Sequence, residues 1–221
     1  MPALRADFSS AVVQPPGHQL KLLRNTIEPY LKVLGSKAID FLHILQGGTT
    51  LIIMAYSLYD ATVSMAIGAL KSLSQILNRA EEHPDCTRLL TARLIDDTKP
   101  LRFQVHYATF QAQYLAAKLS GCEYTEPEDD LDTYEKMQAR IQQALEALKE
   151  VDRETANGRA DVTTQFARSD HMMEVPVKGV VTLVNMPNIY FHVSMAYAIL
   201  RKEGVPLGKR DWSRGFVGDY I

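Results

Sequence analysis

The sequence has few of the residues that mark a specialised class of protein. Among its 221 residues are only two cysteines, Cys86 and Cys122, which form neither a CxxC pair nor a zinc-like spacing. Such scarcity argues against a disulfide scaffold and favours a reducing, intracellular setting. We therefore expect a cytoplasmic protein.

Long apolar runs and an excess of one charge are also missing. The longest fully apolar run is LIIMAY, at residues 51–56, which is far too short to span a bilayer. The net charge is −2, and the densest charge run, EPEDDLD at residues 126–132, is acidic and typical of a solvated loop. The sequence has no basic stretch long enough to bind a nucleic-acid duplex. We expect neither a membrane nor a nucleic acid as partner.

Sequence motifs of known chemistry are absent as well. The chain contains no GxGxxG after a predicted strand, no P-loop, no GxSxG and no HExxH. No motif therefore dictates a reaction, and the function has to be inferred from the fold and from single residues.

Helical periodicity is the strongest pattern that the sequence does contain. Apolar residues at helical spacing predict helices from residue 57 to just before 84, and over about 99–119, 134–151 and 187–202. Asp97 or Thr98 is expected to cap the second helix, and Asp132 with Glu135 resembles a capping box for the third. Residues 152–182 predict a loose hairpin or irregular excursion, and residues 204–212 an extended tail.

This order of elements predicts the fold class. Long helices with one excursion before the last indicate an all-α four-helix bundle over residues 54–221. Residues 1–53 form a separate N-terminal extension with helical periodicity, interrupted by Pro29 and Gly35. Two interpretations of it stay open: a genuine lid over the bundle, or a translation start placed too far upstream.

The second predicted helix is apolar on two sides. One stripe is aliphatic and the other aromatic, and a helix of this kind is usually covered on both sides. The aromatic stripe consists of Phe103, Tyr107, Phe110 and Tyr114. Its cover could be the N-terminal segment, another protomer or a ligand.

Four segments in order carry a resemblance to a known family. They are MAYSLYDATVSMAIGALKSLSQIL, ARLIDDTKPLRFQV, LDTYEKMQARIQQALEALKEVD and PNIYFHVSMAYAILRKEGVPLGKRD, within residues 54–212. They resemble an uncharacterised domain-of-unknown-function family that is similar to the DinB/YfiT-like helical bundles and has bacterial and fungal members. The resemblance implies a four-helix bundle, often dimeric. We therefore expect a homodimer.

The wider superfamily also implies a metal site, which this chain matches poorly. Relatives there bind a divalent metal through three histidines, and some are thiol-dependent transferases. His192 matches the histidine of the family's last block, but Leu183 and Phe110 stand where many members have a histidine and an acidic residue. A stable divalent site normally needs at least three protein ligands. No cofactor is expected, and a divalent metal is disfavoured.

His192 is the first candidate for a site residue. It lies on the apolar face of the last helix, and a buried neutral imidazole needs partners for its nitrogens. Expected partners are Gln104, Tyr56, Tyr59 and Tyr197. Three roles stay open: a hydrogen-bonded core histidine, a general acid or base facing a pocket, and a metal ligand.

The remaining candidates surround His192 in the predicted bundle. His106 is expected to be half-exposed, at the rim of an aromatic pocket. With Gln104, Tyr107, Tyr56 and Tyr197 it completes the expected ligand-binding set. Three functions compete: a metal-independent enzyme or binder for a small, partly aromatic metabolite, conceivably in secondary metabolism; a non-catalytic dimeric accessory bundle; and a metal-dependent DinB-like transferase.

Overall fold

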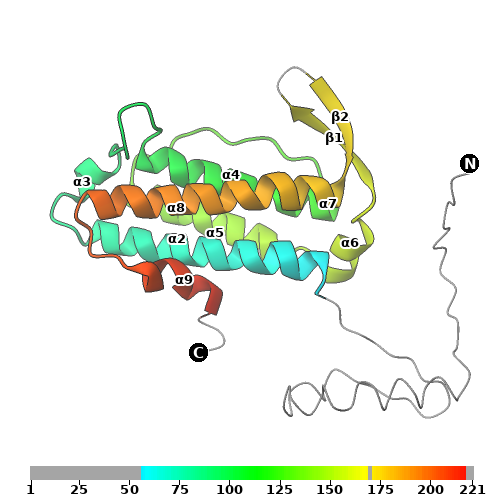
Figure 1. Cartoon of the computed structure of the whole chain (residues 1–221), viewed down its shortest axis with the longest axis horizontal. Coiled ribbons are helices and arrows are strands. Elements are labelled where there is room, and N and C mark those ends of the chain that lie inside the picture. Colours follow the sequence, from blue (N-terminus) through cyan, green and yellow to red (C-terminus); the bar gives the residue numbers. More distant parts are fainter. Residues whose placement is uncertain (1–55, 169–170, 218–221) are drawn as a thin grey trace, which may run out of the picture. The chain divides into compact units, whose positions relative to one another are not determined.

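The fold is a helical bundle with a small two-stranded sheet (Figure 1). The computed structural model describes residues 56–168 and 171–217, so the expected extension over residues 1–53 lies outside the described residues. None of the helices in the described part is long and apolar enough to cross a membrane.

Long helices form the body of the fold. They are α2 (Met65–Glu81), α4 (Leu101–Ser120), α5 (Tyr134–Lys149) and α8 (Met186–Lys202). The shorter elements are α3 (Cys86–Leu89), α6 (Arg153–Gly158), α7 (Val177–Val180), α9 (Lys209–Val217), β1 (Thr163–Arg168) and β2 (His171–Pro176). Two π-helical turns interrupt this pattern: η2 (Asp60–Ser64) precedes α2, and η3 (Val181–Asn185) joins α7 to α8.

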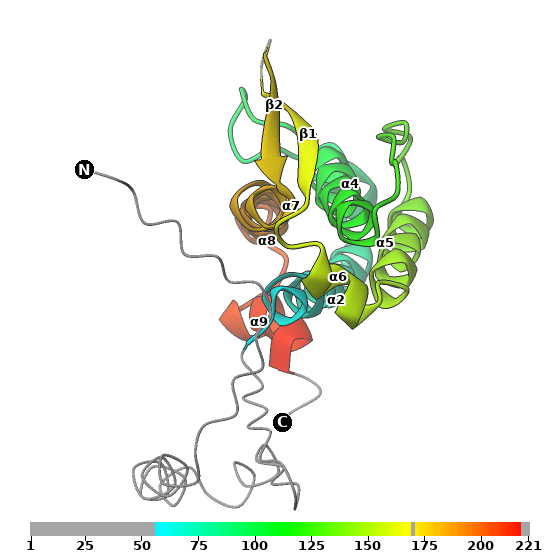
Figure 2. The same ribbon diagram turned by 90° about the vertical axis from the view of Figure 1, so that its right-hand side faces the viewer.

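The long helices pack side by side around one apolar core. Viewed along the bundle, α4 lies between α5 and α8, and α2 closes the group on the other side (Figure 2). Leu70, Leu73 and Leu77 of α2 are fully buried, as is the predicted aliphatic stripe of α4. Each such leucine stabilises the fold by about 2 kcal/mol, which explains why the 3.6-residue period was a sound guide.

The helix ends differ in detail from the predicted caps. No side chain caps α4, which follows Pro100 directly, so neither Asp97 nor Thr98 serves. The cap of α5 is Thr133, whose side chain accepts a hydrogen bond from Lys136 N, one residue later than predicted. Gly121 and Gly204, at φ 80° and 92°, end α4 and α8 in the left-handed conformation that glycine adopts without strain.

The last helical segment begins earlier than predicted. Helix starts at Val177, not near Pro187, and passes through η3 into α8. Val177, Val180 and Val181 are 0%, 1% and 0% exposed, which places this valine-rich stretch in the core at helical spacing. Burial there outweighs the preference of β-branched residues for strands. The predicted hairpin is present but shorter: β1 pairs antiparallel with β2, from Thr163–Pro176 to Arg168–His171.

The predicted extended tail is wrong, because residues 209–217 form α9 and pack against α2. Two glycines allow the close approach. A Cβ atom on Gly215 would lie 2.2 Å from the carbonyl oxygen of Gly68, and Gly215 N donates to Ser72 Oγ at 3.0 Å. Phe216 covers Gly68, with its Cδ1 2.7 Å from where a Cβ would stand. Close packing at these glycines and the hydrogen bond to Ser72 thus dock the helix on α2.

Candidate functional site

A small hollow lies beside His192, between the start of α4 and the middle of α8. Its volume is about 180 Å³. The lining residues are Thr98, Lys99, Phe103, Gln104, Phe191, His192 and Met195. The two helices run antiparallel here, so the first turn of α4 meets the second turn of α8. Both helices are anchored by core residues, and the walls of the hollow are therefore firmly placed.

A chain of two hydrogen bonds fixes the imidazole. Gln104 donates from Nε2 to the carbonyl oxygen of Lys99 at 2.9 Å, which leaves its Oε1 to face His192 Nδ1 at 2.7 Å. An amide oxygen only accepts, so Nδ1 carries the proton of the neutral ring. His192 Nε2 is then an unprotonated acceptor, and no hydrogen bond joins it to the described residues.

Aromatic rings surround this imidazole. Its centroid lies 4.7 Å from that of Tyr107, 5.1 Å from Phe191 and 6.1 Å from Phe103. The Phe191 ring is perpendicular to the imidazole and 56% exposed, so it stands at the opening of the hollow. These rings remove water from the imidazole while leaving one edge of the hollow open.

Burial sets the protonation state of His192. The side chain is 7% exposed, and desolvation lowers its pKa from 6.5 to about 4. No carboxylate contributes to this shift. At neutral pH the ring is therefore uncharged and acts as a hydrogen-bond acceptor. A general base works best with a pKa near the operating pH, so the site suits orientation of a donor better than proton abstraction.

A second polar contact repeats the first along the same pair of helices. Asn185 Nδ2 donates to Gln111 Oε1 at 2.8 Å, and both side chains are buried. Gln111 follows Gln104 by seven residues, and Asn185 precedes His192 by seven, as antiparallel packing requires. We call these contacts the two rungs. They fix the register of α8 against α4.

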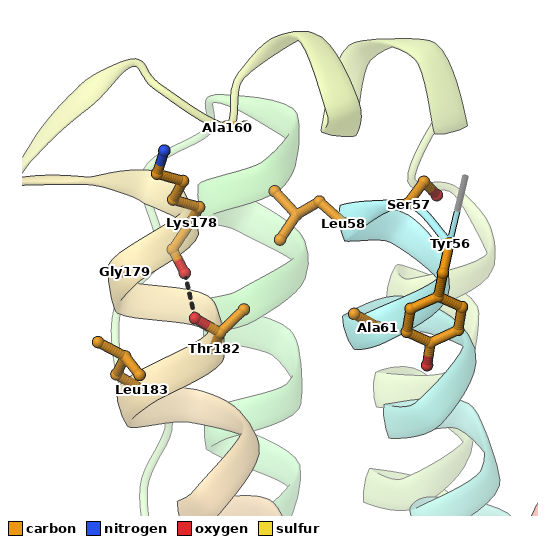
Figure 3. A pocket seen from close by; sticks show the side chains of 9 residues that line it. All are labelled: Tyr56, Ser57, Leu58, Ala61, Ala160, Lys178, Gly179, Thr182 and Leu183. Atoms are coloured by element: carbon orange, nitrogen blue, oxygen red, sulfur yellow. Dashed lines mark hydrogen bonds between the residues drawn. The ribbon is translucent and has the colours of Figure 1, made fainter. Parts of the chain in front are cut away.

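A larger hollow lies at one end of the bundle, between η2 and η3 (Figure 3). Its volume is about 470 Å³, and Leu58, Ala61 and Leu183 contribute to its apolar wall. Its polar groups already have partners. Lys178 Nζ pairs with Asp161, and Thr182 Oγ1 donates to the carbonyl oxygen of Lys178 at 2.6 Å. The hollow offers space without a fixed, unsatisfied group.

The structure brings together only part of the predicted site. Of the expected hydrogen-bond partners of His192 it selects Gln104, and it places Tyr107 against the imidazole. Tyr56 lines the larger hollow instead, 72% exposed, with its hydroxyl donating to Asp60 O at 3.3 Å. Tyr197 packs against the core. Neither tyrosine has a ring contact or hydrogen bond with His192.

The expectation for His106 was wrong. Its side chain is buried rather than half-exposed, and its Nε2 lies 3.1 Å from Glu126 Oε1. Tyr124 stacks on Phe110 at 6.2 Å between ring centroids, and its hydroxyl donates to Gln113 Oε1. Tyr124 thus covers part of the aromatic stripe, and Glu126 pairs with His106, while the acidic side chains at residues 126–132 are exposed, as expected of a solvated loop.

Five of the seven lining residues lay outside the predicted site: Thr98, Lys99, Phe103, Phe191 and Met195. Phe191 lies beside His192 in the chain, and Lys99 lies at the predicted start of a helix. Their position next to a candidate histidine and to a helix start was the signal that could have found them.

The donor set around His192 does not fit a divalent metal. Besides one imidazole nitrogen the lining offers the Thr98 hydroxyl, the Met195 thioether, the Lys99 ammonium and the Gln104 amide, which is already hydrogen-bonded, and it contains no carboxylate, thiolate or second histidine. Leu183 is 76% exposed and lines the larger hollow, while Phe110 stacks on Tyr124. Across the described residues no group of three or more His, Cys, Asp or Glu could hold a metal ion.

Comparisons with known proteins agree with this architecture. Residues 58–213 match the model of a domain of unknown function, DUF1993. The chain is similar to the crystal structure of a DinB family member protein from Shewanella denitrificans, at 32% sequence identity and a TM-score of 0.62, over 70% of this chain and 90% of that one. No curated protein matches.

Proposed function

The chain belongs to the DUF1993 family of DinB-like helical bundles, and we propose that it binds a small, partly aromatic metabolite in the hollow beside His192. We take the body of the fold to be a four-helix bundle working in the cytoplasm, where Cys86 and Cys122 are free thiols. Binding of the ligand requires no metal in this proposal.

One observation carries the proposal: His192 lines a hollow, and its Nε2 is an unprotonated acceptor with no partner among the described residues. Gln104 fixes the tautomer through Nδ1, and the aromatic rings keep the imidazole uncharged. An acceptor fixed in this way stabilises a ligand that carries a hydrogen-bond donor.

The surrounding rings supply the preference for an aromatic ligand. Phe103 and Phe191 present carbon surfaces to the hollow, and aromatic pairs in offset or edge-to-face contact gain about 0.5–1.5 kcal/mol beyond area burial. Tyr107 backs the imidazole and holds its plane. Of the enzyme and the binder, the low pKa of His192 favours the binder.

A ligand screen with matched histidine variants tests the proposal. Small aromatic compounds are added to the full chain, and the side-chain signals of His192 are followed by NMR. We expect binders that shift the His192 Nε2 resonance and that His192→Ala no longer recognises. His83→Ala changes a half-buried histidine whose Nδ1 accepts from Asp85 N, away from the hollow, and should bind normally. Binding that survives His192→Ala in a folded protein contradicts the proposal.

A dimeric accessory bundle is a second candidate, favoured by exposed apolar side chains along η3 and α8. Leu183 is 76% exposed and Phe191 56%. A second copy of the chain covering these residues would remove them from water. Sedimentation of the wild type and of Leu183→Glu tests this idea. A dimer that becomes a monomer in the variant supports it, and a wild type that stays monomeric at all concentrations rejects it.

A further inference from the structure

The rim of the hollow beside His192 carries one positive charge. Lys99 lies at this rim, with its Nζ 5.4 Å from the centroid of the Phe103 ring. None of the ion pairs within the described part of the chain involves Lys99. Lys99 precedes Pro100, the residue immediately before α4. Its carbonyl oxygen accepts a hydrogen bond from Gln104 Nε2, and this bond holds the backbone of Lys99 in place. The backbone of Lys99 is thus held beside the opening, and its exposed side chain brings an ammonium to this rim.

The side of the hollow formed by His192 is uncharged and favours a hydrogen-bond donor rather than an anion. His192 Nε2 can only accept a hydrogen bond, because the single proton of the neutral ring lies on Nδ1 and is donated to Gln104 Oε1. A carboxylate placed against Nε2 would face a second acceptor and gain nothing. An anionic ligand can therefore fit only with its charge at the rim and a donor inside.

Size sets the third condition. A hollow of about 180 Å³ is smaller than the roughly 300–1,000 Å³ typical of sites for drug-sized ligands. A single six-membered ring with short substituents fits this space. The centroid of the Phe103 ring lies 5.4 Å from the Lys99 ammonium and 6.1 Å from the centroid of the His192 imidazole.

We propose that the hollow binds a single-ring aromatic acid that carries an O–H or N–H donor, of the hydroxybenzoate kind. The donor faces His192 Nε2, the ring packs beside Phe103 and Phe191, and the carboxylate meets the Lys99 ammonium at the rim. The inference rests on the proposed function and adds the two substituents that the ligand must carry.

Each substituent has a measurable consequence. Replacing the hydroxyl by a methoxy group puts an ether oxygen against the acceptor Nε2, and sites built for a hydrogen bond reject such analogues strongly. We expect affinity to fall by about 100-fold. Replacing the carboxylate by a neutral amide removes the attraction to an exposed ammonium, which is worth about a fivefold change in Kd and weakens with salt.

Calorimetric titration of the full chain with three probes tests the inference. The probes are 4-hydroxybenzoate, 4-methoxybenzoate and 4-hydroxybenzamide. The wild type should bind 4-hydroxybenzoate most tightly, 4-hydroxybenzamide less tightly and 4-methoxybenzoate most weakly. Lys99→Gln should bind 4-hydroxybenzoate and 4-hydroxybenzamide equally. Lys178→Gln is the matched control, because it removes an exposed lysine from the other hollow and should leave the preference intact.

The outcomes separate this inference from the proposed function. If 4-hydroxybenzamide binds as tightly as the acid, with His192 dependence and no effect of Lys99→Gln, the inference fails and the proposed function stands. If 4-methoxybenzoate binds as well as 4-hydroxybenzoate, the acceptor role of His192 fails, and both fall. If none of the probes binds at millimolar concentration, the inference fails, and the wider screen decides the proposed function.

Discussion

Of the two hollows described above, the smaller one has the polar groups that are better suited to hold a ligand. The one between η2 and η3 is the larger, at about 470 Å³ against about 180 Å³ beside His192. Its polar groups are paired with one another, whereas the smaller hollow keeps one acceptor unpaired and one cation at its rim. Volume alone is therefore a poor guide to a binding site. A polar group that is held in place and lacks a hydrogen-bond partner is a better one.

The physical origin of the difference is burial. His192 is 7% exposed and is held by a neighbour that is itself buried, so its tautomer and orientation are set by the core. Lys178 and Asp161 have side chains that are 54% and 82% exposed, and their ion pair competes with water. A group fixed by the core can recognise a ligand, while an exposed pair mostly satisfies itself.

Acid should distinguish the two hollows most strongly. The folded-state pKa of His192 is about 4, below its ordinary 6.5, so the unfolded chain binds the additional proton between these values. The neutral imidazole therefore makes its full contribution to the free energy of unfolding above pH 6.5. This contribution is lost as pH falls toward 4, where the loss reaches about 3 kcal/mol. Urea unfolding at neutral and acidic pH measures this loss.

His192→Gln is the control for that experiment, because carboxylates such as Asp60 and Glu203 also have lowered pKa values and weaken the fold in acid. Their contribution is common to both proteins and cancels in the difference. The wild type should lose about 3 kcal/mol more than His192→Gln on acidification. Equal losses would mean that the imidazole is not kept neutral by burial.

Removing the partner of His192 should have the next largest effect. Gln104→Leu leaves the buried Nδ1–H of His192 and the carbonyl oxygen of Lys99 without Gln104, which should cost about 2 kcal/mol of unfolding free energy. The counterpart at the larger hollow is Thr182→Val, which loses a hydrogen bond within one helix and should cost below about 1 kcal/mol. Similar losses of unfolding free energy in Gln104→Leu and Thr182→Val would contradict the difference proposed between the two hollows.

A methyl group added to the larger hollow should be harmless. A Cβ atom on Gly179 would have nothing within 4 Å, and Gly179 lies in α7, so Gly179→Ala should raise the unfolding free energy by about 0.5 kcal/mol. Gly215→Ala is the contrasting control, expected to destabilise by about 1–3 kcal/mol because its Cβ meets the backbone of Gly68. Thermal melts distinguish the two signs.

The smallest effect is expected for the charge at the larger hollow. Lys178→Met breaks an exposed ion pair with Asp161 and should change the unfolding free energy by less than about 0.5 kcal/mol. Binding of an aromatic acid beside His192 should be unchanged in the same variant. A drop in that binding would show that the two hollows work together, and the contrast drawn here would fail.

The helices were predictable because their evidence is local. The aliphatic stripe of α4 and the apolar face of α2 follow from periodicity alone, and both are buried as expected. The start of the last helix was not predictable in this way. Its valines favour strands locally, and only packing against the other helices makes Val177 to Val181 helical.

The site was only partly predictable because it depends on contacts between distant segments. Gln104 and His192 are 88 residues apart, and the periodicity of each helix does not encode their relative register. Gln104 was therefore one of several candidate partners, beside Tyr56 and Tyr197. His106 was misjudged for a related reason: the loop that buries it reaches back over α4 through Glu126 and Tyr124.

The two rungs between α4 and α8 have a consequence for how a ligand enters. Sliding α8 by one helical turn, about 5.4 Å, would part Gln104 from His192 and Gln111 from Asn185 and leave four buried side chains unpaired. Such a slide is therefore strongly disfavoured. For the proposed ligand we expect entry past the exposed Phe191 ring, whose rotation takes picoseconds to nanoseconds. Association in this proposal is limited by diffusion and desolvation rather than by a slow conformational step.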